Sequence, residues 1–241
     1  MSEQQRRLSS GKAGLALYKD WVVGEAGYPA LVAYELYNLL LLDLTGAAGY
    51  GLRALALPAF LQSAGANLKI GRGVVIRQPR CVTLGRGIVI DDFAVLDVRQ
   101  KQSEAAAIEL GDYTLLGRSS MIVAKDAVIR LGPAVNVGAF CRIASQSAVS
   151  IGESTLIGAY AYIGPGNHAI TEIDHPIIEQ QMEIRGGVTI GKNCWIGTKA
   201  TILDGVTIGA NAIVGAHSLV REDVPEGAVV AGTPARVLRY R

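Results

Sequence analysis

Residues 188–237 repeat one pattern with a period of six: VTIGKNCWIGTKATILDGVTIGANAIVGAHSLVREDVPEGAVVAGTPARV. Aliphatic side chains stand at Ile190, Ile196, Ile202, Ile208 and Val214, and Gly follows each of them except Ile202. A step of six fits neither a helix nor a long strand, but it fits a short strand followed by a turn. Three such faces make a coil of about 18 residues, and stacked coils bury a column of aliphatic side chains.

The same period extends toward the N-terminus, so that the repeat covers about residues 68–236. Aliphatic–Gly pairs also begin at Ile70, Leu84, Leu110, Leu116, Leu131, Val137, Ile151, Ile157 and Ile163. The pairs that open successive coils, at 110, 131, 151, 190 and 208, are 21, 20, 39 and 18 residues apart. Steps of 20 or 21 predict extra residues at one corner of a coil. The Gly is expected at a corner that needs unusual backbone angles or close approach.

The step of 39 predicts one ordinary coil plus a long excursion, which we place at residues 165–187. Long excursions from a regular solenoid usually serve function. This one contains His168 and His175, two of the three histidines in the chain.

The first 62 residues have a different character and predict a helical extension. Residues 31–43 read LVAYELYNLLLLD, an apolar helix with Glu35, Asn38 and Asp43 on one side, and a second apolar stretch at 54–61 is interrupted by Pro58. No charge-free run reaches the roughly 18 residues that a membrane-spanning helix needs. We expect this extension to pack on the repeats or on a sister subunit. The alternative is peripheral membrane contact through residues 31–61, which the lack of Lys and Arg on the polar side weakens.

Composition excludes several classes of function. The net charge of +2 and a charged fraction of 18% give no sign of a nucleic-acid-binding surface. Cys81, Cys141 and Cys194 form no CxxC pair, and they are expected to be small buried side chains in a reducing compartment. The first dozen residues lack the apolar core of a signal peptide. We therefore expect a cytoplasmic protein, with the inner face of the membrane as the alternative location.

Two segments resemble the hexapeptide-repeat acyltransferases, most closely the sugar O-acetyltransferases of polysaccharide gene clusters. The first is residues 188–237, which end in AGTPA at 231–235, and the second is GPGNHAITEIDHPIIEQQ at 164–181. The resemblance covers about residues 66–239. It implies an all-β solenoid, a left-handed parallel β-helix over residues 63–241 behind the N-terminal α-helical extension of 1–62. It also implies a homotrimer with active sites between subunits and a short C-terminal tail.

The resemblance places the chemistry on His168, which matches the family's catalytic histidine by position. A neutral imidazole suits removal of the acceptor hydroxyl proton as the oxygen attacks the thioester of acetyl-CoA. Acetyl-CoA is the expected cosubstrate, and no metal is required. Backbone N–H groups around Trp195, Ile196 and Gly197 are candidates for stabilising the oxyanion.

The resemblance also implies a coenzyme A groove along the stacked corners of the last coils. Its expected residues are Gly197, Ala216, Ser218, Thr233, Pro234 and Ala235. Arg236 and Arg239 are expected to meet the phosphates, or else to form an ordinary solubilising tail. His217 stands where relatives commonly have Gly, so this histidine either contacts the cofactor or fills a corner.

Acceptor recognition is expected from residues in and just before the excursion. Asp174, His175 and Gln180 can bind sugar hydroxyls, and Asp174 can alternatively orient an imidazole. Tyr160 and Tyr162 can form an apolar wall beneath a sugar ring, or simply pack at outward-facing positions. Trp195 joins them as a candidate acceptor contact.

The function that these residues predict is acetyl-CoA-dependent O-acetylation of a sugar or polysaccharide-precursor hydroxyl. N-acetylation of an amino sugar stays open, because His168 serves either reaction. A zinc enzyme like the gamma-class carbonic anhydrases is a further alternative, since the chain has three histidines, although their spacing departs from that family's pattern. A non-catalytic solenoid scaffold is the last. A lipid-linked saccharide becomes a reasonable acceptor if residues 31–61 do touch a membrane.

Overall fold

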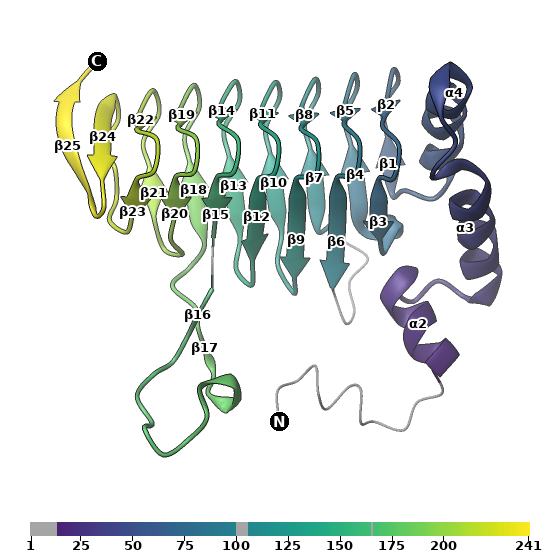
Figure 1. Cartoon of the computed structure of the whole chain (residues 1–241), viewed down its shortest axis with the longest axis horizontal. Helices are drawn as coiled ribbons and strands as arrows, with labels where there is room; N and C mark the ends of the chain where they lie inside the picture. The colour runs from purple at the N-terminus through teal and green to yellow at the C-terminus, as the bar shows by residue number, and fades with distance from the viewer. Residues whose placement is uncertain (1–13, 100–105, 165) are drawn as a thin grey trace.

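The computed structural model describes residues 14–99, 106–164 and 166–241. Most of this chain winds into a prism of stacked triangular coils, with the helices packed on the end where the first coil lies (Figure 1). One long loop leaves the prism midway along its length, and the strand β25 (Ala235–Tyr240) closes the opposite end.

Three parallel sheets form the sides of the prism. The first sheet contains β1 (Ser63–Ala64), β4 (Val82–Leu84), β7 (Ile108–Leu110), β10 (Ile129–Leu131), β13 (Val149–Ile151), β18 (Val188–Ile190) and β21 (Thr207–Ile208). The second contains β2 (Lys69–Ile70), β5 (Val89–Ile90), β8 (Leu115–Leu116), β11 (Asn136–Val137), β14 (Leu156–Ile157), β19 (Trp195–Ile196), β22 (Ile213–Val214), β24 (Ala228–Gly232) and the antiparallel β25. The third contains β3 (Val75–Arg77), β6 (Val95–Arg99), β9 (Met121–Lys125), β12 (Arg142–Ser145), β15 (Tyr162–Ile163), β20 (Thr201–Ile202) and β23 (Leu219–Val220).

The aliphatic residues of the six-residue repeat form the core, as the periodicity predicts. On the second sheet, one side chain per coil points inward, and each is buried and in register with the next: Ile70, Ile90, Leu116, Val137, Ile157, Ile196 and Val214. Because each coil covers the apolar face of its neighbour, the core is continuous along the prism.

Close approach, rather than an unusual backbone angle, explains the glycine that follows most of these aliphatic residues. A Cβ on Gly191 would lie 2.5 Å from the backbone nitrogen of Ala210 in the next coil. The left-handed corner residue comes two positions later, as at Asn193 with φ 55°. Gly164 is an exception, since it combines a φ of +75° with a close approach to the Ala144 carbonyl.

Extra residues enter at the corner that joins the third sheet to the first sheet of the next coil. Between β10 and β13 the register advances by 20 residues, from Ile129 to Val149. Leu84 and Leu110, which pair between β4 and β7, are 26 residues apart in the chain. The additional residues of this coil lie between β6 and β7. The excursion between β15 and β18 leaves from this same corner.

From Gly14 onward, where the structure describes it, the N-terminal extension contains α2 (Gly14–Val22), α3 (Tyr28–Leu41), α4 (Gly46–Ala56) and the 3-10 turn η1 (Leu57–Ala59). The helix α3 buries Tyr34, whose hydroxyl donates to the carbonyl of Ile76 at 2.7 Å and so joins the helix to the first coil. The expectation that Asp43 lies on a helix face is wrong, because α3 ends at Leu41. None of the helices in the described ranges has both the length and the hydropathy to cross a membrane.

No disulfide joins the three cysteines within the part of the chain that the structure describes. Cys141 and Cys194 are buried, and Cys81 is half-buried. Burial raises the pKa of each thiol above its ordinary value, which disfavours the reactive thiolate. The cysteines are therefore small core side chains, as the sequence predicts.

Candidate active site

The excursion carries a short hairpin that presents His168. It contains β16 (Asn167–His168), the 3-10 turn η3 (Ile177–Glu179) and β17 (Met182–Glu183), and β16 pairs antiparallel with β17. The loop projects away from the prism (Figure 1), which places His168 outside the core, with its side chain exposed.

A buried carboxylate fixes the point at which this loop returns to the prism. Asp204 accepts hydrogen bonds from the backbone nitrogens of Arg185, at 2.7 Å, and Gly187, at 2.8 Å. The hydroxyl of Ser147 approaches the same carboxylate at 3.3 Å. Sequence reasoning missed Asp204, and the only signal was an acidic residue at the end of the buried stretch that precedes Gly205.

The imidazole of His168 lies against the far arm of the loop. Its Nδ1 is 3.4 Å from the carbonyl oxygen of Gln180. In the tautomer that carries its proton on Nδ1, the ring donates to this carbonyl and leaves the lone pair of Nε2 available. That is the arrangement that a general base requires.

Gln180 braces the tip of the loop through its side-chain amide. Its Nε2 donates to the carbonyls of Glu172, at 2.8 Å, and His175, at 3.0 Å. The Nδ1 of His175 is 3.2 Å from the carboxylate of Glu172. Glu172 thus stands beside an imidazole, a position that the sequence analysis considered for Asp174, which is exposed nearby on the tip.

The predicted cofactor residues gather along the edge between the second and third sheets, in the last coils. A Cβ on Gly197 would lie 2.5 Å from the nitrogen of Ala216. The buried hydroxyl of Ser218 accepts from the nitrogen of Gly232 at 3.2 Å, and Thr233 donates its hydroxyl to the carbonyl of His217 at 3.2 Å. Pro234 and Ala235 follow Thr233 at the turn into β25.

His217 occupies a left-handed corner of the prism. Its φ is 58°, and its side chain is exposed. Other corners of the prism hold non-glycine residues at similar φ values, so both His and Gly suit the position.

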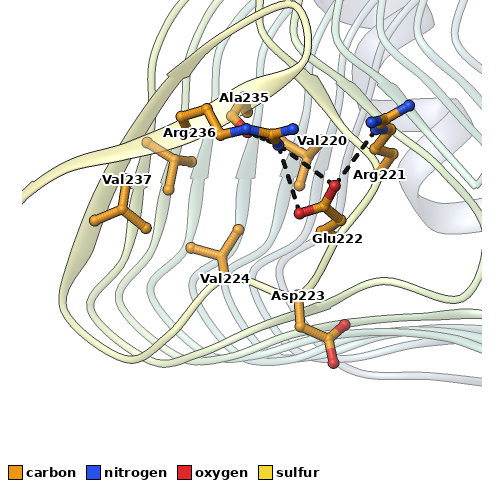
Figure 2. Close-up of a pocket in the computed structure, with 9 residues that line it drawn as sticks. Val220, Arg221, Glu222, Asp223, Val224, Ala235, Arg236 and Val237 are labelled. Carbon is orange, nitrogen blue, oxygen red and sulfur yellow. Dashed lines mark hydrogen bonds and ion pairs between the residues drawn. The ribbon is translucent and has the colours of Figure 1, made fainter.

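A pocket of about 100 Å³ opens beside these residues at the C-terminal end of the prism (Figure 2). Val220, Val224 and Val237 line its apolar side, and Arg221 and Arg236 approach it from the rim. The guanidinium of Arg236 contacts the Glu222 carboxylate at 3.4 Å and donates to the carbonyl of Ala235 at 2.9 Å. A phosphate at Arg236 would therefore compete with Glu222. Arg239 lies on β25, and its guanidinium donates to the carbonyl of Tyr240 at 3.3 Å.

The aromatic candidates lie on the prism rather than on the loop. Tyr160 is at the same edge as the cofactor residues and stacks on Phe140, with ring centroids 5.1 Å apart and planes 7° from parallel. Tyr162 faces outward from β15, and Trp195 is exposed on β19. Phe140 was missed, although it stands two residues after Gly138 as Tyr160 stands two residues after Gly158.

The predicted site residues of one chain therefore form two groups. His168, Asp174, His175 and Gln180 belong to the loop, whereas Tyr160, Gly197, Ala216, Ser218 and Thr233 belong to the edge between the second and third sheets. The loop starts from the other edge of the third sheet. Across the described ranges, no hydrogen bond or ion pair joins one group to the other. Nor do three His, Cys, Asp or Glu side chains of that part of the chain converge as metal ligands.

Comparison with known proteins identifies the repeat. Residues 187–222 match the bacterial transferase hexapeptide (six repeats) family. A probable acetyltransferase of Mycobacterium tuberculosis is 32% identical over 160 residues, which are 66% of this chain and 50% of that protein. Nodulation protein L of Rhizobium meliloti is 47% identical over 98 residues, which are 40% of this chain and 51% of that protein. The chain thus spans about half the length of the curated relatives it matches.

The solved structures show a related fold. The N-acyltransferase AntD of Bacillus cereus, in a mutant form with dTDP and coenzyme A, aligns with a TM-score of 0.51 at 19% identity. The alignment covers 83% of this chain and 91% of AntD. Together with the stacked parallel sheets, this likeness confirms the predicted left-handed parallel β-helix with its N-terminal helical extension.

Proposed function

We propose that this chain, which contains hexapeptide repeats, transfers the acetyl group of acetyl-CoA to a hydroxyl of a saccharide or polysaccharide precursor. The observation that carries the proposal is His168, held on a long loop with Nδ1 3.4 Å from the carbonyl oxygen of Gln180, a contact that in the Nδ1–H tautomer leaves the lone pair of Nε2 for the acceptor. The similarity to a probable acetyltransferase over 160 residues supports the same class of reaction.

The proposed reaction uses His168 first as a base and then as an acid. Nε2 removes the proton of the acceptor hydroxyl while the oxygen attacks the carbonyl carbon of the thioester. The N–H groups of Trp195 and Gly197 already donate to the carbonyls of Ala212 and Val214, so another backbone N–H of this corner would stabilise the resulting oxyanion. The carbon–sulfur bond then breaks, the imidazolium returns its proton to the sulfur, and the products are an acetyl ester and free coenzyme A.

Label transfer from radioactive acetyl-CoA to a panel of sugars, sugar phosphates and nucleotide-linked sugars tests this proposal. We expect a labelled product whose acetyl group is released by mild hydroxylamine, as an ester is. A label that resists hydroxylamine would identify N-acetylation of an amino sugar, the second candidate, because an amide survives this treatment. Absence of transfer to every acceptor would refute acetyl transfer and favour a scaffold, or, if purified protein carries zinc, a metalloenzyme.

We propose that the protein acts as a homotrimer, with each site completed between two chains. The separation of the loop group from the edge group within one chain supports this arrangement. So do the apolar side chains that the loop exposes, among them Ile170, Ile173 and Ile178, since a neighbouring prism would cover them. A solution mass equal to one chain of 25.4 kDa would contradict the proposal.

We also propose peripheral contact with the inner face of the cytoplasmic membrane through residues 31–61. The exposed faces of α3 and α4 are apolar: Val32, Leu36, Leu39, Leu40, Leu52 and Leu55 point to solvent, and Leu39 is 80% exposed. Arg53, the one charged residue of α4, is buried, so it does not interrupt this surface. A lipid-linked saccharide would then be a suitable acceptor.

Replacing both Leu39 and Leu40 with glutamate is expected to reduce vesicle binding about tenfold or more, because the change removes two exposed apolar side chains and adds two charges. Co-sedimentation with phosphatidylcholine–phosphatidylglycerol vesicles measures the effect. Leu238→Glu is the control for a single exposed leucine, since Leu238 is about as accessible as Leu40 and lies on β25 at the opposite end of the prism. Failure of the wild-type protein to sediment with vesicles would rule out the contact.

A further inference from the structure

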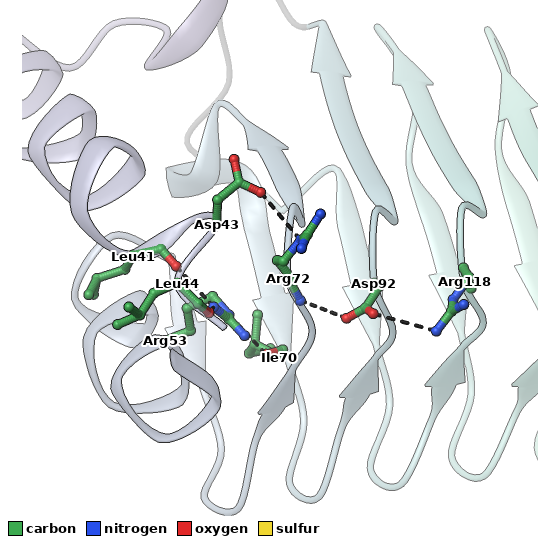
Figure 3. Close-up of polar contacts among 8 residues, drawn as sticks. All are labelled: Leu41, Asp43, Leu44, Arg53, Ile70, Arg72, Asp92 and Arg118. Carbon is green, nitrogen blue, oxygen red and sulfur yellow. Dashed lines mark hydrogen bonds and ion pairs between the residues drawn. The ribbon is translucent and has the colours of Figure 1, made fainter. Parts of the chain in front are cut away.

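One edge of the prism changes chemical character halfway along its length. At the edge between the second and third sheets, each coil turns through two corner residues. In three successive early coils the first of these residues is Arg72, then Asp92, then Arg118 (Figure 3). The backbone nitrogen of Arg72 donates to Asp92 at 2.8 Å, and the guanidinium of Arg118 lies 3.5 Å from the same carboxylate. After Arg118 the charges end, and the corresponding residues are Ala139, Ala159, Thr198 and Ala216.

Large side chains occupy the left-handed corner positions in these later coils, the last of them His217, and Phe93 holds the same position in an earlier coil. Phe140, Tyr160 and Lys199 follow one another with φ values of 58°, 62° and 59°, and all three side chains are exposed. The stacked rings of Phe140 and Tyr160 continue into Lys199, whose ammonium is 5.9 Å from the centre of the Tyr160 ring. We name Phe140, Tyr160 and Lys199 the edge ridge.

The edge ridge carries a positive charge without a neighbouring acid. Within the described ranges, Lys199 makes no ion pair with a carboxylate, and no Asp or Glu stands among the corner residues of these four coils. The edge between the first and second sheets differs, because its corners carry Asp112, Glu153, Lys192 and Glu226, and most of its later left-handed positions hold small polar residues. The edge ridge is therefore particular to the edge between the second and third sheets and does not follow from the repeat itself.

We propose that the edge ridge binds the acceptor, and that this acceptor is a saccharide carrying a phosphate or phosphodiester group, an inference that rests on the proposed acetyl transfer. The half-exposed rings of Phe140 and Tyr160 offer an apolar surface to the C–H groups of a sugar ring. Lys199 supplies the cation that a phosphate requires. The predicted cofactor residues begin at Gly197, two residues from Lys199, so the thioester and the acceptor share one edge of the prism.

Equilibrium binding tests the inference without requiring transfer. The probes are the methyl glycosides of glucose, galactose, mannose and their N-acetylamino forms, with the corresponding 1-phosphates and uridine-diphosphate derivatives, each measured by calorimetry. We expect at least one phosphorylated sugar to bind about tenfold tighter than its methyl glycoside. Phe140→Ala is expected to weaken all forms by roughly five- to tenfold, whereas Lys199→Gln is expected to weaken only the phosphorylated forms, by about tenfold.

Two controls separate the ridge from general effects of substitution. Tyr113→Ala removes an exposed ring from the edge between the first and second sheets, where the Arg86 guanidinium lies 5.7 Å from the centre of that ring. This substitution should leave the affinity for every sugar probe unchanged. Alanine suits such corners, because Ala134 has a φ of 55°. The affinity of each variant for coenzyme A should equal that of the wild type.

Several results would overturn the inference. They are a lack of binding by every phosphorylated probe, affinities that Phe140→Ala and Lys199→Gln leave intact, or losses confined to coenzyme A. Equal affinity for a sugar 1-phosphate and its uridine-diphosphate form would show that the sugar-proximal phosphate suffices, as in a lipid-linked acceptor. Binding of the nucleotide form alone would identify a nucleotide-linked acceptor. If the edge ridge binds sugars but no acetyl transfer occurs, the proposed function is refuted and the binding inference stands.

Discussion

His168→Ala is expected to lower kcat for acetyl transfer by about a thousandfold, with little change in the affinity for acetyl-CoA. A positioned general base contributes roughly a hundred- to ten-thousandfold, and alanine cannot take the hydroxyl proton. The imidazole is exposed and, among the described residues, makes one hydrogen-bond contact, at 3.4 Å, so its removal should not unfold the loop. Steady-state kinetics with the best acceptor from the label-transfer panel measures the effect.

His175→Ala is the matched control for this prediction. It removes an imidazole from the same loop, and it leaves in place the bonds between Gln180 and the backbone of Glu172 and His175. We expect His175→Ala to raise the KM for the acceptor at most, while kcat stays within about threefold of the wild type. A His168→Ala enzyme that retains a tenth or more of the wild-type kcat would remove His168 from the proposed mechanism.

Arg53→Met is expected to reduce the free energy of unfolding by about 3 kcal/mol, because it removes the donor of one buried and two part-buried hydrogen bonds. Arg53 is 3% exposed, and its Nε donates to the carbonyl of Ile70 in the first coil at 3.1 Å (Figure 3). Its Nη1 donates to the carbonyls of Leu41 at 2.9 Å and Leu44 at 2.6 Å, near the C-terminal end of α3. One guanidinium thus ties α4, α3 and the prism together. Urea unfolding followed by circular dichroism measures the change.

Arg72→Met provides the comparison, because Arg72 is an arginine beside the same junction with an exposed partner. Its Nε is 3.5 Å from the carboxylate of Asp43, and the side chains of Arg72 and Asp43 are 45% and 76% exposed. Exposed ion pairs contribute little, so we expect a change below about 0.5 kcal/mol. Equal destabilisation by the two substitutions would show that the buried carbonyl contacts of Arg53 do not hold the helices to the prism.

The repeat could be predicted from the sequence because each coil packs against coils that have the same spacing of aliphatic residues. The spacing of Ile190, Ile196 and Ile202 defines the three faces of one coil. Because the next coil has the same spacing, its aliphatic residues pair with those of the first, as Ile208 pairs with Ile190. The excursion between Gly164 and Gly187 was visible for the same reason, as a break in a period. The sequence did not show why position 191 requires glycine, since the close approach involves Ala210 in another coil.

The site was only partly predictable. The resemblance identified His168, but it could not show that the imidazole faces the Gln180 carbonyl or that Gln180 itself braces the loop. Asp204 was missed because it anchors backbone that lies 17 and 19 residues earlier in the chain. Phe140 was missed because its importance depends on a ring in the next coil.

The sequence by itself determined the period, the aliphatic core, the helical character of the first part and the position of the loop, because each depends on residues within a few positions of one another. Only the tertiary structure decided which edge each candidate residue occupies, how Arg53 joins the helices to the first coil, and which side chains form the edge ridge. Those features depend on contacts between coils and across the helical end, where the partners are separated in the chain and no local pattern specifies the pairing.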